Sequence, residues 1–177
     1  VRNIDLSQGA ITETGGPFDI AIRGEGFFAV DTPEGQRLTR AGHFMPNAQG
    51  DLVTPDGHLL LDAGGAPVFV PPDARSVAIA ADGTVSADGN PVAQIGVVMP
   101  EDPLSLRHEP GVLFSFEGAT LPADDATLLQ GKLENSNVNP ILEISRMIEV
   151  QRAYELGQAF LDREGDRRSK LVDTLMR

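Results

Sequence analysis

Residues 133–160 read LENSNVNPILEISRMIEVQRAYELGQAF, and this stretch divides the chain into two chemically different parts. Its first eight residues hold three Asn and one Ser, a polar cluster that the rest of the sequence does not repeat. The 37 residues that follow Pro140 contain two Gly and no Pro, which favours one long helix. We therefore expect a joint over residues 132–140 and an axial helix over residues 141–177.

The joint contains a local signal for the start of a helix. The side-chain oxygen of Asn139 is suited to N-cap the helix, and Pro140 then takes the first helical position, where its missing N–H costs nothing. A cap needs only one Asn. We expect the surplus residues Asn135, Ser136 and Asn137 to satisfy backbone groups where the chain changes direction.

The predicted helix is apolar on more than one side. Leu142, Leu156 and Phe160 lie opposite a broader apolar side, which on a helical wheel consists of Ile141, Ile144, Met147, Ile148, Val150, Tyr154 and Leu161. A helix with two apolar sides needs more than one neighbour, which favours a bundle made with other segments or chains. Packing of the helix on its own β domain remains the simpler alternative.

The preceding residues have the rhythm of short strands. Turn signals such as Asp56-Gly57, Asp82-Gly83 and Asp88-Gly89 recur at roughly 6 to 14 residue intervals. Between them lie short apolar runs rich in branched or aromatic residues: FFAV, HLLL, PVFV, SVAIA, QIGVVM and VLFSF. We predict a mainly β chain with twisted, barrel-like antiparallel sheets over residues 14–131, an extended segment at 1–13, and the long C-terminal helix.

Charge and composition exclude several classes of function. The net charge is −12, and residues 141–177 carry seven acidic and seven basic residues, so residues 1–140 hold all of it. Nucleic acid is therefore not an expected partner, because binding it requires basic patches. The chain has no Cys, no run of 18 apolar residues and no signal-peptide pattern. Because it begins at Val1 and not at Met, we expect a further N-terminal part to precede it.

No catalytic, metal or cofactor motif emerges from the sequence. The three His residues form no HExxH or HxH pair, and Gly24-Glu25-Gly26 lacks the third glycine of a dinucleotide fingerprint. Asp82 and Asp88 miss the spacing of a calcium loop, so we interpret them as turn residues. We expect no catalytic residue, no metal and no cofactor.

Two longer motifs resemble one known family. Residues 17–61, PFDIAIRGEGFFAVDTPEGQRLTRAGHFMPNAQGDLVTPDGHLLL, resemble the core of flagellar basal-body rod and hook proteins. Residues 131–160, GKLENSNVNPILEISRMIEVQRAYELGQAF, resemble the same family's C-terminal signature. Within the family, the SNVNP motif and the compact middle resemble the proximal-rod member more than the distal-rod member.

The resemblance implies a structural subunit and not an enzyme. Family members assemble helically through terminal helices, transmit torque, and pass through the flagellar type III export apparatus to the periplasm-spanning rod without a cleavable signal. Their partners are other rod subunits, not nucleic acids or small molecules. The resemblance implies that Gly24 and Gly26 shape the turn of the GEGFF segment, and that the helix faces its neighbours through Ile141, Ile144, Met147, Ile148, Gln151, Tyr154 and Leu161. It also implies an N-terminal helical segment, which we expect to lie upstream of Val1.

Two readings from other classes remain open at this point. The chain is compatible with a secreted β-rich module that binds a carbohydrate or metal and carries a helical anchor. It is also compatible with a hydrolase that uses surface carboxylates. A binding module needs a concave patch of aromatic residues, whereas a hydrolase needs two carboxylates that converge in a cleft with shifted pKa values.

Overall fold

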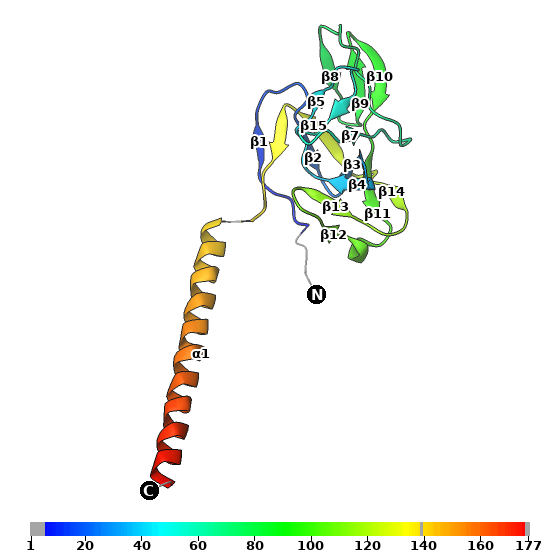
Figure 1. Cartoon of the computed structure of the whole chain (residues 1–177). Coiled ribbons are helices and arrows are strands. Elements are labelled where there is room, and N and C mark those ends of the chain that lie inside the picture. The colour runs from blue at the N-terminus through cyan, green and yellow to red at the C-terminus, as the bar shows by residue number, and fades with distance from the viewer. Residues whose placement is uncertain (1–5, 139, 176–177) are drawn as a thin grey trace. The chain divides into compact units, whose positions relative to one another are not determined.

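The computed structural model describes residues 6–138 and 140–175, with backbone alone at 140, 161–162 and 166–175. The chain forms two compact units, one ending at Asn137 and the other beginning at Val138. The first, called here the β unit, contains the strands, and the second contains the helix α1 (Figure 1). The predicted fold class, mainly antiparallel β with a long C-terminal helix, is confirmed.

The largest sheet of the β unit has nine strands. Along its main path the strand order is β12-β13-β4-β3-β7-β6-β5, and β11 branches off by pairing with both β3 and β14. The strands are β3 (Phe27–Thr32), β4 (Gly35–Thr39), β5 (Met45–Pro46), β6 (Leu52–Val53), β7 (Leu59–Leu60), β11 (Val97–Pro100), β12 (Arg107–His108), β13 (Leu113–Ser115) and β14 (Thr120–Pro122). A 3₁₀ turn, η1 (Pro103–Ser105), follows β11.

Three smaller sheets complete the β unit. Their strands are β8 (Val77–Ile79), β9 (Thr84–Ala87) and β10 (Asn90–Gln94) in one sheet; β2 (Ile20–Arg23) and β15 (Thr127–Gln130) in another; and β1 (Ile11–Glu13) and β16 (Lys132–Glu134) in the third. Every pairing is antiparallel. The sheets of the described residues do not close into a barrel.

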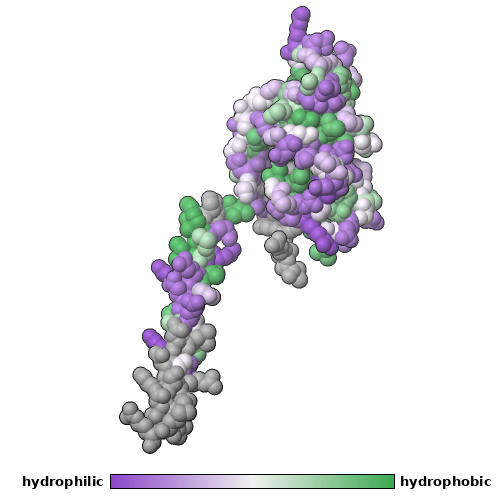
Figure 2. Space-filling model, in the orientation of Figure 1, coloured by the Kyte–Doolittle hydropathy of each residue, from purple (hydrophilic) through white to green (hydrophobic). Residues whose placement is uncertain are grey.

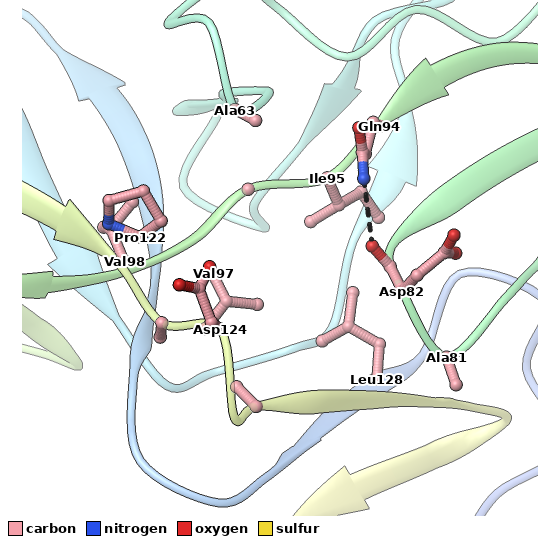
Figure 3. Close-up of a pocket in the computed structure, with 13 residues that line it drawn as sticks. Ala63, Ala81, Asp82, Gln94, Ile95, Val97, Val98, Pro122, Asp124 and Leu128 are labelled. Atoms are coloured by element: carbon pink, nitrogen blue, oxygen red, sulfur yellow. Dashed lines mark hydrogen bonds between the residues drawn. The ribbon is translucent and has the colours of Figure 1, made fainter.

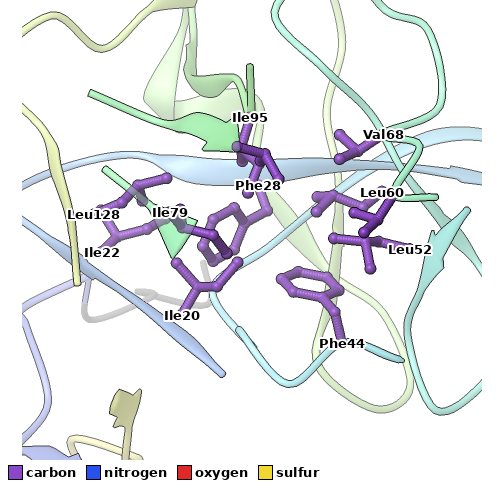
Figure 4. Packing of buried hydrophobic residues seen from close by; sticks show 12 residues of the cluster. Ile20, Ile22, Phe28, Phe44, Leu52, Leu60, Val68, Ile79, Ile95 and Leu128 are labelled. Atoms are coloured by element: carbon purple, nitrogen blue, oxygen red, sulfur yellow. The ribbon is translucent and has the colours of Figure 1, made fainter. Parts of the chain in front are cut away.

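Strand β3 organises the core. Its consecutive apolar side chains point alternately to opposite faces, so Phe28 packs into one cluster while Phe27 and Ala29 pack into another. The larger cluster collects residues from most of the β unit, including the ring of Phe44, which meets Phe28 edge-on at 5.3 Å between centroids (Figure 4). The continuous run FFAV is therefore explained by burial on both faces.

One predicted strand does not form. The run PVFV (67–70) makes only isolated bridges, in which Leu61 pairs with Pro67 and Asp51 with Phe69. Val68 and Val70 are still buried while Phe69 is 44% exposed. The segment therefore contributes side chains to the core although its backbone does not extend a ladder.

Helix α1 spans Pro140–Leu175. Glu143 lies in its first turn, where a negative charge is favourable beside the unpaired backbone N–H groups. No helix within the described residues combines the length and the apolar content needed to cross a bilayer.

Candidate assembly surface

Helix α1 exposes large apolar side chains along its described turns. The exposed fractions run from 44% at Ile148 to 73% at Ile141. The other exposed residues of this kind on α1 are Leu142, Ile144, Met147, Val150, Tyr154, Leu156 and Phe160. Figure 2 shows apolar side chains gathered on the described turns at the start of α1. Apolar groups concentrated on one exposed element are typical of a protein interaction surface.

The residues predicted to face neighbouring subunits all lie on α1. Ile141, Ile144, Met147, Ile148 and Tyr154 are exposed. Gln151 is exposed too, and its Nε2 donates to Glu155 Oε1 over 3.2 Å. Leu161 belongs to the helix, but its side chain lies outside the described residues.

Three polar side-chain contacts described on α1 are short-range and exposed. Arg146 pairs with Glu143 at 2.9 Å, three residues away, and Gln158 Nε2 donates to the Tyr154 hydroxyl at 3.0 Å. Exposed pairs of this kind contribute only about 0.2–1 kcal/mol to stability. The helix surface therefore gains little from its own side-chain contacts.

The joint residues contact the N-terminal end of the described chain. Asn135 N donates to Ala10 O at 2.9 Å, and the amide of Asn137 donates to Ser7 O at 2.9 Å. Ser136 is exposed. The predicted N-cap, Asn139, lies outside the described residues, and α1 begins at Pro140.

The GEGFF segment turns through two glycines in the left-handed region. Gly24 has φ 104° and Gly26 has φ 135°, conformations that side chains with a Cβ rarely adopt. A Cβ on Gly26 would also lie 2.5 Å from Val97 Cγ1. The carbonyls of both glycines accept hydrogen bonds from Arg40, a residue that the sequence analysis did not single out.

A second cluster of polar groups surrounds Asp19 at the start of β2. Its carboxylate accepts a hydrogen bond from the Thr14 hydroxyl and lies 2.6 Å from His43 Nδ1. The Thr14 bond, followed by the His43 contact, holds the pKa of Asp19 below its ordinary value even though burial opposes this. The backbone carbonyl of Asp19 accepts from Gly131 N at 2.7 Å, so the cluster anchors the turn between β15 and β16.

An open cavity of about 240 Å³ lies among the turn before β9, strand β11 and the segment before β15 (Figure 3). Its lining includes Asp82, Asp124 and Gln94 among Ala, Val, Ile and Leu side chains. Gln94 Nε2 donates to the backbone carbonyl of Asp82 at 3.2 Å, and the carboxylate of Asp82 accepts from Thr84 N at 3.0 Å. That backbone bond lowers the pKa of Asp82, which is opposite to the shift that a general acid requires.

The histidines occupy separate places. His43 contacts Asp19, whereas His108 meets the Phe114 ring edge-on at 5.2 Å. His58 follows a turn in which its backbone N donates to Thr54 Oγ1. Within the described ranges 6–138 and 140–175, no three His, Asp or Glu residues gather in the manner of a metal site.

Two family models match the chain. Residues 21–87 match the flagellar hook protein FlgE/F/G D1 domain, and residues 129–174 match the flagellar basal body rod FlgEFG protein C-terminal region. The first match contains Arg40 and the GEGFF segment, and the second contains β16, the joint and most of α1.

Individual relatives agree with these matches. The flagellar basal-body rod protein FlgF of Caulobacter vibrioides is 39% identical over 173 residues, covering 97% of this chain and 71% of the relative. FlgF of Mesorhizobium japonicum is 37% identical, covering 96% and 71%. The flagellar basal-body rod protein FlgG of Bacillus subtilis is 34% identical, covering 94% and 69%. The comparisons thus support the FlgF type more than the FlgG type.

Proposed function

Because the chain belongs to the flagellar basal-body rod protein family and is a structural subunit of the basal body, we propose that α1 is the element through which it joins the axial structure. The apolar residues Ile141, Ile144, Met147, Ile148, Tyr154 and Leu161, together with Gln151, then face helices of neighbouring axial subunits. The single observation that supports this proposal most directly is the exposure of the apolar side chains of α1.

The energetics favour assembly over a solitary helix. Complete burial of one exposed Ile or Leu side chain is worth about 1.5–3 kcal/mol, and α1 carries several of them. When each copy contacts the next through a different surface and the rotation between copies does not close a ring, the contacts generate an open helical assembly. Apolar residues on two sides of α1 are suited to this arrangement.

Family membership also supports inferences about the position of the subunit in the rod, its export and its mechanical role. We infer that the subunit belongs to the proximal rod, because the FlgF relatives at 36–39% identity support that type more than the distal-rod type. We also infer that it passes through the flagellar type III export apparatus without a cleavable signal and transmits torque from the motor to the hook. These inferences are supported by family membership and by the resemblance of the C-terminal motif.

A catalytic or ligand-binding role receives less support. The relatives are structural proteins, and the carboxylate of Asp82 in the open cavity is engaged by its own turn. We therefore propose that the chain acts through assembly and not through a bound substrate or cofactor.

The proposal is tested by placing charge on the apolar side of α1. In a strain that produces only the altered subunit, we expect the double variant I144D/I148D to lose swimming in soft agar and to yield few complete rods. Ser145 lies between these positions and is exposed, so S145D adds the same kind of charge to the same turn as a matched control.

The control and the double variant separate the outcomes. We expect S145D to swim nearly as well as the unaltered strain, with both variant proteins present at normal levels. Normal swimming of I144D/I148D would contradict the proposal. An equal loss of swimming in S145D would contradict the proposal too, because it would show that a charge at any position on this turn of α1 prevents assembly.

A further inference from the structure

Arg40 and Glu134 form an ion pair in which both side chains are mostly buried. Their side chains are 16% and 7% exposed, and Arg40 Nη2 lies 2.8 Å from Glu134 Oε2. They are 94 residues apart in sequence, Arg40 directly after β4 and Glu134 at the end of β16. Neither residue belongs to a motif that predicts a role for it from sequence.

The two side chains of this pair form hydrogen bonds with each other and with the backbone at Gly24, Gly26 and Gly9. Arg40 Nε donates to Glu134 Oε2 at 2.9 Å, while its Nη1 and Nη2 donate to the carbonyls of Gly26 and Gly24 at 2.9 and 3.2 Å. The other carboxylate oxygen, Glu134 Oε1, accepts from Gly9 N at 2.8 Å. The guanidinium also lies over the Phe27 ring, 6.0 Å from its centroid. We call this set of contacts the clasp.

The clasp joins the short two-stranded ribbon of β1 and β16 to the well-packed strand β3. Strands β1 and β16 pair through only three residue pairs, from Ile11–Glu134 to Glu13–Lys132, and a two-stranded ribbon of that length is marginal by itself in water. The GEGFF segment, by contrast, leads into β3, whose side chains fill both core clusters. The clasp therefore attaches the ribbon to the most deeply packed strand of the β unit.

The ribbon formed by β1 and β16 leads into α1 through β16, so its attachment affects the connection to the helix. Strand β16 is the last strand before α1, so whatever force passes along the backbone between the β unit and α1 passes through it. Two other contacts attach the ribbon to β2 and its flanks: Asp19 O accepts from Gly131 N at the turn before β16, and Gln8 Nε2 donates to Ile22 O at 2.6 Å before β1. Both lie away from the last residue of β16. The clasp constrains that end of the strand directly, at Glu134.

We propose that Arg40 and Glu134 are positioning residues that lock the β1–β16 ribbon onto the β unit and fix the direction of the strand leading into α1. The inference rests on the rod function but concerns stiffness and not assembly. A buried ion pair adds little net stability compared with apolar residues of similar size, yet its geometry is far more restrictive. The fork of Arg40 holds two glycine carbonyls and one carboxylate in a single arrangement, which an apolar contact cannot do.

The test removes both charges at once from the full-length protein. The double variant R40M/E134M leaves no buried unpaired charge and keeps apolar volume at both sites. We expect amides of residues 10–15 and 131–135 to exchange hydrogen at least ten-fold faster than in the unaltered protein. Amides of β3 and β4 should exchange at unchanged rates, because the core clusters remain packed.

A second ion pair provides the matched control. Arg37 and Glu109 meet at 2.9 Å with 17% and 26% exposure, on β4 and the segment after β12, away from the ribbon. The variant R37M/E109M should leave ribbon exchange within two-fold of the unaltered protein. Ribbon exchange that stays within two-fold in R40M/E134M would overturn the proposal, as would equal acceleration in both double variants.

A cellular readout distinguishes stiffness from assembly. We expect a strain producing R40M/E134M to make flagella in normal number but to swim at less than half the normal speed in a viscous medium. Normal speed under that load would overturn the mechanical part of the proposal. Absence of flagella would overturn it as well, because the pair would then serve assembly itself.

A milder variant covers the case in which R40M/E134M does not fold. R40K keeps the positive charge beside Glu134 but cannot reach the carbonyls of Gly24 and Gly26 with a planar fork. We expect ribbon amides to exchange at least three-fold faster in R40K. Unchanged exchange in this variant would overturn the role assigned to the fork.

Discussion

The β unit and α1 contain the same kinds of apolar side chain, but the β unit buries them whereas α1 exposes them. Ile20, Ile22 and Phe28 are fully buried in the β unit, whereas Ile141 and Phe160 on α1 are 73% and 62% exposed. The first region completes its core with its own strands, while the second presents its apolar surface outward. The difference indicates that the β unit builds its core from its own strands, and it supports the proposal that α1 packs against other axial subunits.

The largest effect that separates the two regions is expected from truncating a phenylalanine in each. Phe28→Ala removes a fully buried ring that meets Phe44 edge-on, and we expect a loss of about 3–5 kcal/mol in the free energy of unfolding of the β unit. Phe160→Ala should change it by less than about 0.5 kcal/mol. Urea unfolding followed by circular dichroism measures both, and equal losses would contradict the comparison.

A glycine substitution in each region is expected to act with opposite sign. A Cβ on Gly42 would collide with the backbone carbonyl oxygen of Ile20, so Gly42→Ala should destabilise the β unit by about 1–3 kcal/mol. A Cβ on Gly157 of α1 meets nothing within 4 Å, and Gly157→Ala should favour the helix by about 1 kcal/mol. Far-UV circular dichroism at the helical minimum should deepen in the second variant and not in the first.

A smaller effect concerns the loss of stability in acid. We expect Asp19 of the β unit to contribute to it. The pKa of Asp19 is lowered in the folded state, by the Thr14 hydroxyl first and then by His43. Its contribution is therefore complete above the unfolded pKa, near about 3.9, and is lost as the pH falls through the lower folded value. We expect the stability difference between the unaltered protein and Asp19→Asn, about 1 kcal/mol at pH 6, to shrink below about pH 4.

Denaturant unfolding at pH 6, 4 and 3 measures that difference. Thr14→Val removes the hydrogen bond that contributes most to the lowered pKa of Asp19, and it should weaken the pH dependence in the same direction. A difference between the unaltered protein and Asp19→Asn that stays constant from pH 6 to pH 3 would show that this carboxylate is not the acid-sensitive group.

Local patterns in the sequence predicted the elements better than the contacts between them. Asp-Gly turns, short apolar runs and the Gly-poor, Pro-free tail identified a β region followed by a helix beginning at Pro140. The apolar composition of PVFV predicts a strand, and Val68 and Val70 are buried, but strand formation depends on a partner that the local sequence does not specify. The same local information could not distinguish twisted open sheets from closed ones.

The long-range contacts had no local signal. The pairing of β1 with β16 and the bond from Asn137 to Ser7 join residues between 119 and 130 positions apart. Arg40 and Glu134 resembled ordinary surface charges in the sequence, although both lie inside the motifs that carry the family resemblance. Only the fold brings them together. The interface residues on α1 followed from helical periodicity and from the resemblance, and their role remains a prediction.

The central claim is that the β unit is stable by itself, whereas α1 depends on assembly partners. Hydrogen exchange of the full-length protein at low micromolar concentration tests it directly, because a helix without tertiary contacts is marginal in water. We expect amides of β3 to be protected at least about 1,000-fold more strongly than amides of residues 141–160. Protection of α1 equal to that of β3, in a sample shown to be monomeric, would contradict the account.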